Sequence, residues 1–282
     1  MSAADSAGAA VDEVWSRWPF DIGIVGTGIV GTHQITREAE EVIRRSNHTF
    51  LIASGVGVLD YIATLCPKVS DLGELYEPGL NRMPTYHRMA AEVVAAAQVE
   101  APVCLAAYGH PWVYCYPTSL INRAAPLLGL RVEVFAGISA FDTLLVDLGT
   151  DIAMNGIQMY EATDLLLRHR PIQNDVTCIV WQPTVVGDPT CPSGPADASH
   201  FQPLQDHLLR FYPAEHEAKL VTTRTHPLLP STVRTVRLGE LTAALEGVPG
   251  VGTLYIPALT ERPVTDEDLL RFMTTAGSAA RP

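Results

Sequence analysis

Several common features are missing from this chain of 282 residues, and each absence excludes a class of protein. No apolar run reaches the roughly 18 residues needed to cross a membrane. The first residues lack the basic start and apolar core of a signal peptide. We therefore expect a flexible leader over 1–20 and a cytoplasmic protein. There is no Cys-x-x-Cys or His-x-x-x-His pair, and the five cysteines are scattered, so neither a disulfide framework nor a metal site is predicted.

Positive charge is also scarce. Lysine and arginine number 19 against 31 aspartates and glutamates, which gives a formal net charge of −12. Because binding to phosphates needs a basic face, nucleic acid and anionic membranes are disfavoured as partners, and small molecules and peptides remain. A hydrophobic content of 47% with 18% charged residues indicates a folded chain with a substantial core.

Predicted strands and helices alternate along the first half, which indicates an α/β fold with a mostly parallel, covered sheet. Thr32 is a predicted cap for a helix with Ile35, Ala39 and Val42 at helical spacing. In the second half strands outnumber helices. The expected strands are 21–25, 50–53, 103–107, 132–135, 176–181, 219–225, 232–238 and 252–256, and the expected helices are 89–97, 117–128 and 200–211.

This alternation divides the chain into two α/β subdomains. We expect the first at 21–139 and the second at 140–258, followed by a short tail at 259–282. Within the tail, Thr265-Asp266-Glu267-Asp268 is typical of a helix start.

A glycine loop follows the first expected strand. Gly26-Thr27-Gly28-Ile29-Val30-Gly31 fits the Gly-x-Gly-x-x-Gly pattern of dinucleotide-binding folds. That function also needs an acidic residue near the end of the second strand to bind the ribose, and no acid occurs there before Asp60. A nicotinamide cofactor is therefore a distant alternative, although the glycines still permit close approach of the backbone.

The turn Tyr108-Gly109-His110-Pro111 ends a buried strand run. A glycine and a proline at this place allow a sharp turn, and ligands of α/β proteins bind at the carboxyl ends of strands. Taken alone, an ordinary strand-to-helix turn explains the segment equally well. Further motifs change that balance: Gly137-Ile138-Ser139-Ala140, Glu161-Ala162-Thr163, Trp181-Gln182, and a tyrosine-arginine segment containing Tyr76, Arg82 and Tyr86.

In this order the motifs resemble the tetrapyrrole methylase fold, whose members use S-adenosylmethionine (SAM). The Tyr-Gly-His-Pro form is most similar to the borosin peptide backbone α-N-methyltransferases, and the likeness covers about 21–257. Ala136 and Trp112 depart from the family, which commonly has proline and glycine there. The resemblance implies a SAM cleft between the two subdomains. It also implies that the cofactor is bound by Gly26, Gly28, Tyr108, Gly109, His110, Val113, Ser139, Ala140, Gln182 and Thr253.

The tyrosine-arginine segment provides the candidate catalytic residues. An amide nitrogen is a poor nucleophile because its lone pair is delocalised, so methylation requires proton removal and stabilisation of the imidate charge. Tyr76 with a lowered pKa could be the base, and Arg82 could hold the oxyanion. Tyr86 follows Arg82 at i+4 on the same helix face. A solvated Arg82, a surface Tyr76, a structural His110 that donates a hydrogen bond and a helix-starting Glu161 are the simpler alternatives.

The resemblance also bears on the substrate and the assembly. About 25 residues follow Pro257, too few for the clasp and substrate peptide of the fused relatives. We therefore predict methylation in trans of a separate precursor peptide by a homodimer. The alternatives are a methylase of a tetrapyrrole or other small molecule on the same fold, and a non-catalytic SAM- or peptide-binding partner.

Overall fold

The computed structural model describes residues 19–52, 55–153, 155–191, 198–248 and 251–278. Most of the predicted leader and part of the predicted loop at 187–198 therefore lie outside the described residues. The chain forms two compact units. The first takes the chain up to Thr150 together with 187–196 and 221–233, and the second takes the rest.

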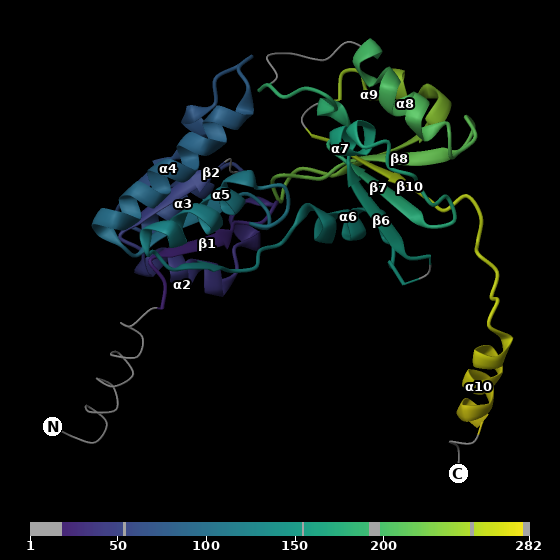
Figure 1. Ribbon diagram of the computed structural model, residues 1–282, viewed down its shortest axis with the longest axis horizontal. Helices are drawn as coiled ribbons and strands as arrows, with labels where there is room; N and C mark the ends of the chain where they lie inside the picture. The colour runs from purple at the N-terminus through teal and green to yellow at the C-terminus, as the bar shows by residue number, and fades with distance from the viewer. Residues whose placement is uncertain (1–18, 53–54, 154, 192–197, 249–250, 279–282) are drawn as a thin grey trace. The chain divides into compact units, whose positions relative to one another are not determined.

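The first unit is built on a parallel sheet of five strands (Figure 1). The strand order is β3-β2-β4-β1-β5, and each neighbouring pair is parallel, as the sequence predicts. β1 therefore lies between β4 and β5, so the turns that follow these three strands leave the same edge of the sheet. The strands are β1 (Ile22–Gly26), β2 (His48–Ile52), β3 (Val69–Asp71), β4 (Val103–Ala107) and β5 (Val132–Val134).

Helices pack on both faces of this sheet. On one face α4 (Arg82–Glu100) and α5 (Tyr116–Ala124) enclose a core that includes Ile24 and Leu105. On the other face α2 (Arg37–Arg45) and α3 (Val58–Leu65) enclose a core that includes Val25. Because successive strand residues point to opposite faces, strands buried on both sides read as continuous apolar runs in the sequence.

The predicted cap at Thr32 is wrong. Gly31–Gln34 forms a short 3₁₀ helix, and Ile35 then adopts an extended conformation, so no helix can run on from Thr32. Helix α2 is capped instead by Thr36, whose Oγ1 accepts a hydrogen bond from the backbone N–H of Ala39 at 3.0 Å.

Helix α4 contains the predicted helical residues 89–97 and begins at Arg82, so Arg82 and Tyr86 lie on one helix at i+4, as predicted. Its cap is Asn81, whose side-chain oxygen accepts from the backbone N–H of Met83 at 2.9 Å. Pro84 is tolerated because the first turn of a helix has backbone N–H groups without intrahelical partners. The helix therefore starts at the predicted catalytic residue Arg82.

The second unit contains most of a mixed sheet in the order β6-β7-β10-β8-β9, with β6 parallel and β10 antiparallel to β7. The short helices of this half are α7 (Ala162–Leu167), α8 (Gln202–Leu208) and α9 (Leu241–Leu245). The strands are β6 (Ile157–Glu161), β7 (Thr177–Trp181), β8 (Glu217–Thr222), β9 (Thr232–Arg237) and β10 (Thr253–Ile256).

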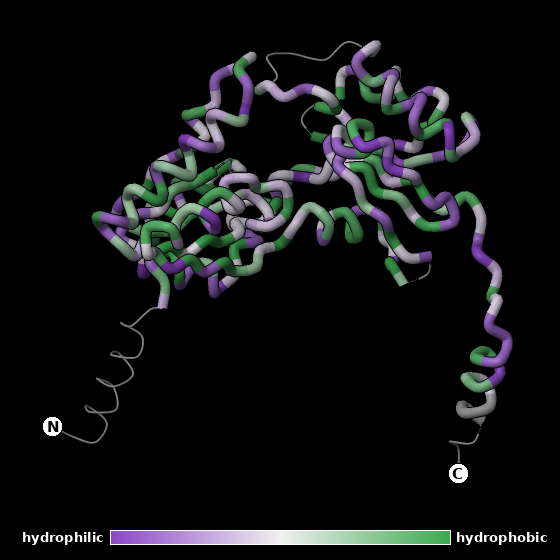
Figure 2. The backbone as a smooth tube through the Cα atoms, viewed as in Figure 1, coloured by the Kyte–Doolittle hydropathy of each residue, from purple (hydrophilic) through white to green (hydrophobic). Residues whose placement is uncertain are grey.

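Two further helices complete the described chain. Helix α6 (Ala140–Leu148) belongs to the first unit, and α10 (Glu267–Ser278) follows β10. Hydrophilic and hydrophobic residues alternate along α10 in Figure 2. Within the described ranges no helix has the length and apolar character to cross a membrane.

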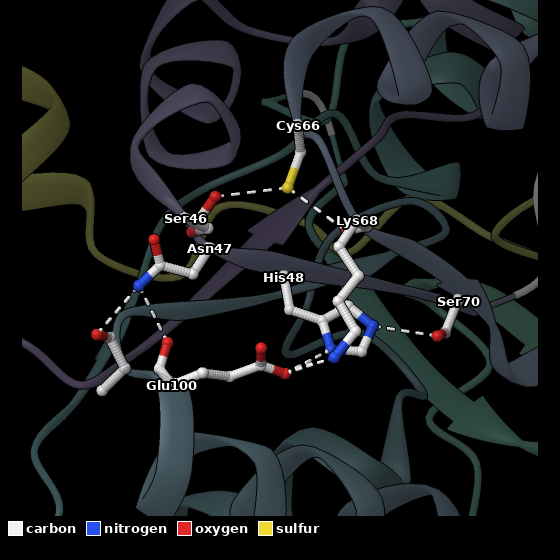
Figure 3. A network of polar contacts seen from close by, with 8 residues as sticks. Ser46, Asn47, His48, Cys66, Lys68, Ser70 and Glu100 are labelled. Carbon is white, nitrogen blue, oxygen red and sulfur yellow. Dashed lines mark hydrogen bonds and ion pairs between the residues drawn. The ribbon is translucent and has the colours of Figure 1, made fainter.

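A polar network ties the amino-terminal edge of the first sheet to the end of α4 (Figure 3). The buried ring of His48 contacts Glu100 Oε1 through Nδ1 and Ser70 Oγ through Nε2, both at 2.9 Å. Lys68 Nζ donates to the same Glu100 oxygen at 2.7 Å. Together these contacts lower the pKa of Glu100, Lys68 first and His48 second. Every polar atom of the buried ring is thereby paired, as burial demands.

Candidate active site

The predicted glycine turns meet backbone to backbone. A Cβ added at Gly26 would lie 2.2 Å from the carbonyl oxygen of Gly109 and 2.8 Å from Gly137 Cα. Gly28 and Gly109 also exchange backbone hydrogen bonds, at 3.3 and 3.0 Å. A Cβ at Gly137 would likewise lie 2.6 Å from the Gly109 carbonyl oxygen, so the contact between the turns after β1, β4 and β5 requires glycine at 26 and 137, whereas Gly109 is favoured by its φ of +74°. Any ligand at this edge meets one joined platform.

The glycine loop differs from that of a dinucleotide-binding fold. The backbone N–H groups of Ile29 and Val30 donate to the side-chain oxygen of Gln34 at 2.7 and 2.9 Å. The loop opens only the short 3₁₀ helix of Gly31–Gln34. A pyrophosphate would need free N–H groups at the start of an α-helix. These contacts add to the missing ribose-binding acid as arguments against a nicotinamide cofactor.

The turn after β4 is held by its own histidine. His110 Nδ1 accepts a hydrogen bond from the backbone N–H of Trp112 at 3.1 Å, and the carbonyl of His110 accepts from Val113 at 2.9 Å. His110 thus makes a structural hydrogen bond within the turn, which was the alternative to cofactor binding. Its ring accepts this bond, whereas we expected the ring to donate one. Burial raises the pKa of Tyr108. The indole of Trp112, the departure from the family pattern, is 50% exposed.

The remaining predicted cofactor residues lie in both units. Ser139 caps α6: its hydroxyl accepts from Phe141 and Asp142 and donates to the Asp142 carboxylate at 2.6 Å, and Ala140 is the first residue of that helix. In the second unit, Gln182 adopts a left-handed conformation directly after β7. Thr253 pairs with Trp181, next to Gln182, so the structure brings these two predicted residues together.

The predicted catalytic tyrosines are in contact. The rings of Tyr76 and Tyr86 meet edge to face with centroids 6.2 Å apart, and Tyr116 lies 6.1 Å beyond Tyr86. The expected lowering of the Tyr76 pKa is wrong, because burial, followed by the nearby Tyr86, raises it. Tyr116 was missed by sequence reasoning, although an aromatic residue before Pro117 was visible.

Arg82 is held by a segment that is remote in the sequence. Its Nη2 donates to the carbonyl oxygen of Asp188 at 2.7 Å, across 106 residues. Burial raises the pKa of Cys191, and the positive charge of Arg82 partly offsets this rise. Cys191 is also one of the groups that raise the pKa of Tyr76. The predicted base and the predicted oxyanion holder therefore share Cys191 as a neighbour. No sequence signal connected Asp188 or Cys191 with this site.

A cavity of about 540 Å³ lies in the first unit, beyond the glycine platform. Its volume is within the range of small-molecule pockets. Residues on three segments line it: Val30 and Gln34, then Ile138 and α6, then the loop after β8. None of the thirteen predicted site residues is among its lining residues, although Gly28 and Ser139 are close in sequence to the lining residues Val30 and Ile138. Among the described residues, no cluster of side chains suited to a metal ion occurs.

Comparison with known proteins identifies relatives of both kinds that the motifs predicted, namely the tetrapyrrole methylase family and, within it, the borosin group. A family model described as Tetrapyrrole (Corrin/Porphyrin) Methylases matches residues 21–176. The chain is 30% identical over 253 residues to the methyltransferase/ribosomally synthesized cyclic peptide omphalotin A precursor of Omphalotus olearius, covering 88% of this chain and 60% of that protein. It is 29% identical over 236 residues to the corresponding gymnopeptides precursor of Gymnopus fusipes, covering 83% and 56%. The chain thus spans a little over half the length of these relatives.

Solved structures agree on the fold. Uroporphyrin-III C-methyltransferase from Thermus thermophilus superposes with a TM-score of 0.59 at 19% identity, covering 84% of this chain and 91% of that one. A structure of this enzyme complexed with S-adenyl homocysteine gives a TM-score of 0.57 at 15% identity, covering 84% and 96%. The predicted fold is confirmed, and so is the resemblance to the borosin group. Because the family model matches more than half of this chain, the chain belongs to the tetrapyrrole methylase family, whose methyl donor is S-adenosylmethionine.

Proposed function

We propose that this protein is a SAM-dependent methyltransferase that methylates backbone amide nitrogens of a peptide. The observation that carries the proposal is the ring contact of Tyr76 with Tyr86, which follows Arg82 by one turn at the start of α4. The relatives of similar sequence, which are named as methyltransferases fused to cyclic peptide precursors, point to the same substrate class.

The chemistry explains why these residue types suit an amide. SAM supplies a methyl group already activated by a positive sulfur, so the chain itself has to make the amide nitrogen nucleophilic. That nitrogen must lose its proton, and the charge that then develops on the carbonyl oxygen must be stabilised. Arg82 carries a permanent positive charge and several N–H donors beyond the one used by Asp188, so it can hold this oxygen.

The raised pKa of Tyr76 fits a base for such a weak acid. A phenolate whose pKa is high accepts a proton more strongly than an ordinary phenolate, and a backbone amide holds its proton very tightly. The cost is that few molecules carry the phenolate at neutral pH. Turnover should therefore increase as the pH rises toward the Tyr76 pKa.

The glycine platform fits a ligand that is bound mostly through backbone groups. Gly26, Gly109 and Gly137 bring three turns together at the carboxyl edge of the sheet, where ligands of α/β folds bind. We propose that this platform and Tyr108 bind SAM. Methylation of a tetrapyrrole or another small molecule is the second candidate, favoured by the description of the matched family model.

Co-expression with short peptides encoded beside the gene, followed by tandem mass spectrometry, tests the proposal. A mass gain of one methylene per modified backbone nitrogen is expected, with the peptide on a separate chain. Methylation of uroporphyrinogen III together with no gain in any peptide would establish the second candidate instead.

Arg82→Ala tests the mechanism. We expect it to bind SAM normally but to lose turnover by at least roughly a hundredfold, because an oxyanion donor is removed. Arg88→Ala is the matched control, since Arg88 lies on the same helix, is exposed and pairs with Glu92. Turnover by Arg82→Ala equal to that of Arg88→Ala would remove Arg82 from the mechanism.

We also propose a homodimer, as the resemblance implies. Helix α10 exposes Leu269, Leu270 and Met273 by 46 to 63%, and a second copy of the chain could cover these side chains. Size-exclusion chromatography with light scattering should give twice the chain mass of 30.5 kDa. A single-chain mass at micromolar concentration would refute the dimer.

A further inference from the structure

We propose that the segment Gly187–Cys191, called the strap below, is a positioning element for Arg82. The inference rests on the proposed role of Arg82 and adds residues that the motifs do not contain. The strap follows β7 and the short 3₁₀ helix Pro183–Val185 in the chain, yet it belongs to the first unit.

The strap pairs with the tyrosine-arginine segment through four hydrogen bonds. Three join backbone groups. In two of them the N–H of Gly79 donates to the carbonyl oxygen of Cys191 at 2.8 Å, and the N–H of Cys191 donates to the carbonyl oxygen of Leu80 at 3.1 Å. In the third, the backbone N–H of Arg82 donates to the carbonyl oxygen of Pro189 at 2.9 Å, and the fourth bond runs from the side-chain Nη2 of Arg82 to the carbonyl oxygen of Asp188 at 2.7 Å.

The two bonds from Arg82 fix both ends of its side chain. As the first residue of α4, Arg82 has a backbone N–H without an intrahelical acceptor, and the carbonyl of Pro189 supplies one. At the far end, a guanidinium is planar, so anchoring one nitrogen limits the orientation of the whole group. The strap thus holds Arg82 in one orientation while leaving its other N–H donors available.

The strap is itself shaped by Asp188. Its Oδ1 accepts from the backbone N–H of Thr190 at 2.8 Å and from the Thr190 hydroxyl at 2.7 Å. This local turn presents the carbonyl groups of Asp188 and Pro189 toward Arg82. An asparagine at 188 could accept the same two bonds, whereas an alanine could not.

The experiment compares Asp188→Ala, Asp188→Asn and Thr190→Val in the full-length protein. Asp151→Ala is the matched control, because Asp151 accepts a similar bond from Ala153 in an exposed loop. The substrate is the neighbouring-gene peptide that the wild-type protein methylates in co-expression. We expect Asp188→Ala to lower kcat at least about tenfold with the KM for SAM within about twofold, and Asp188→Asn to restore kcat.

Hydrogen exchange provides a readout that does not depend on turnover. The amide protons of Gly79 and Arg82 should exchange faster in Asp188→Ala and in Thr190→Val, but not in Asp151→Ala. Wild-type kcat in Asp188→Ala, or unchanged exchange, overturns the proposal. Equal losses of kcat, SAM binding and thermal stability overturn it too, because they indicate unfolding. If the wild-type protein methylates no peptide, the proposed function is refuted. The proposal for the strap is then still tested by hydrogen exchange in the variants.

Discussion

Replacing Gly26 by alanine should damage the platform on which the proposed site is built. The added Cβ would meet the Gly109 carbonyl oxygen at 2.2 Å, Gly137 Cα at 2.8 Å and the Pro111 ring at 3.1 Å. Two of these three atoms belong to the backbone of other turns, so a side-chain rotation cannot relieve the contact. The turns after β4 and β5 would have to move away from β1.

The size of the effect follows from the rigidity of these contacts. Overpacking a tight site costs about 1–3 kcal/mol, and a clash with backbone belongs at the upper end. About 3 kcal/mol should lower the melting temperature by roughly 6–12 °C in a protein of this size. Gly252→Ala is the matched control: its Cβ would meet Leu220 Cδ1 at 3.2 Å, and the end of a leucine side chain can shift. We expect the control to cost no more than about 1 kcal/mol.

Thermal unfolding of the two variants and the wild type measures this difference. Calorimetric titration with S-adenosylhomocysteine, performed below the unfolding transition, then tests whether Gly26→Ala also weakens cofactor binding, as we expect. A melting temperature for Gly26→Ala within about 2 °C of the wild type would refute the reasoning, because the turns could then separate at little cost.

Three further changes give separate predictions. Tyr76→Phe should lose turnover by roughly a hundredfold or more, because it removes the proposed base. In the wild type the rate, measured in stopped assays, should rise about tenfold per pH unit from neutral to alkaline pH, because the fraction of Tyr76 that is phenolate rises in the same way. Asp21 has a pKa lowered by Arg131, so its stabilising contribution is present above about pH 4 and lost as the pH falls through the lowered value. Asp21→Asn should therefore show a smaller drop in melting temperature between pH 6 and pH 3 than the wild type. Asp147→Ala removes the acceptor of two hydroxyl bonds from the loop after β8, so trypsin should cleave after Arg224 faster.

The parallel sheet could be predicted from the sequence because its central strands are buried on both faces. The strand β4 was predicted with its observed bounds, and β1 within one residue at each end. The edge strands β3 and β6 were missed, since their residues are half-buried and show no continuous apolar run. For α4 the apolar pattern indicated only 89–97, because the first turns of the helix carry exposed polar residues and a proline.

The site could be predicted only in part. Local motifs with fixed spacing named the glycine turns and the tyrosine-arginine segment, and the structure joins the turns and brings Tyr76 to Tyr86. The direction of the Tyr76 pKa could not be inferred, because it depends on burial in the folded chain. Asp188 was invisible for another reason: a backbone carbonyl accepts the bond from Arg82, and any residue type offers that group.

Because of the strap, the proposed catalytic residues depend on two segments that are far apart in the sequence, and a fragment or hybrid gene can separate them. A fragment ending near Thr150 would contain Tyr76, Arg82 and the whole parallel sheet, yet it would lack the carbonyl groups that hold Arg82. Chimeras that exchange the C-terminal half between relatives would replace the holder of Arg82 together with the second sheet. We therefore expect such hybrids to fold and still methylate poorly unless 187–191 is exchanged back, which makes this short segment the junction to preserve when hybrid methyltransferases are assembled from these relatives.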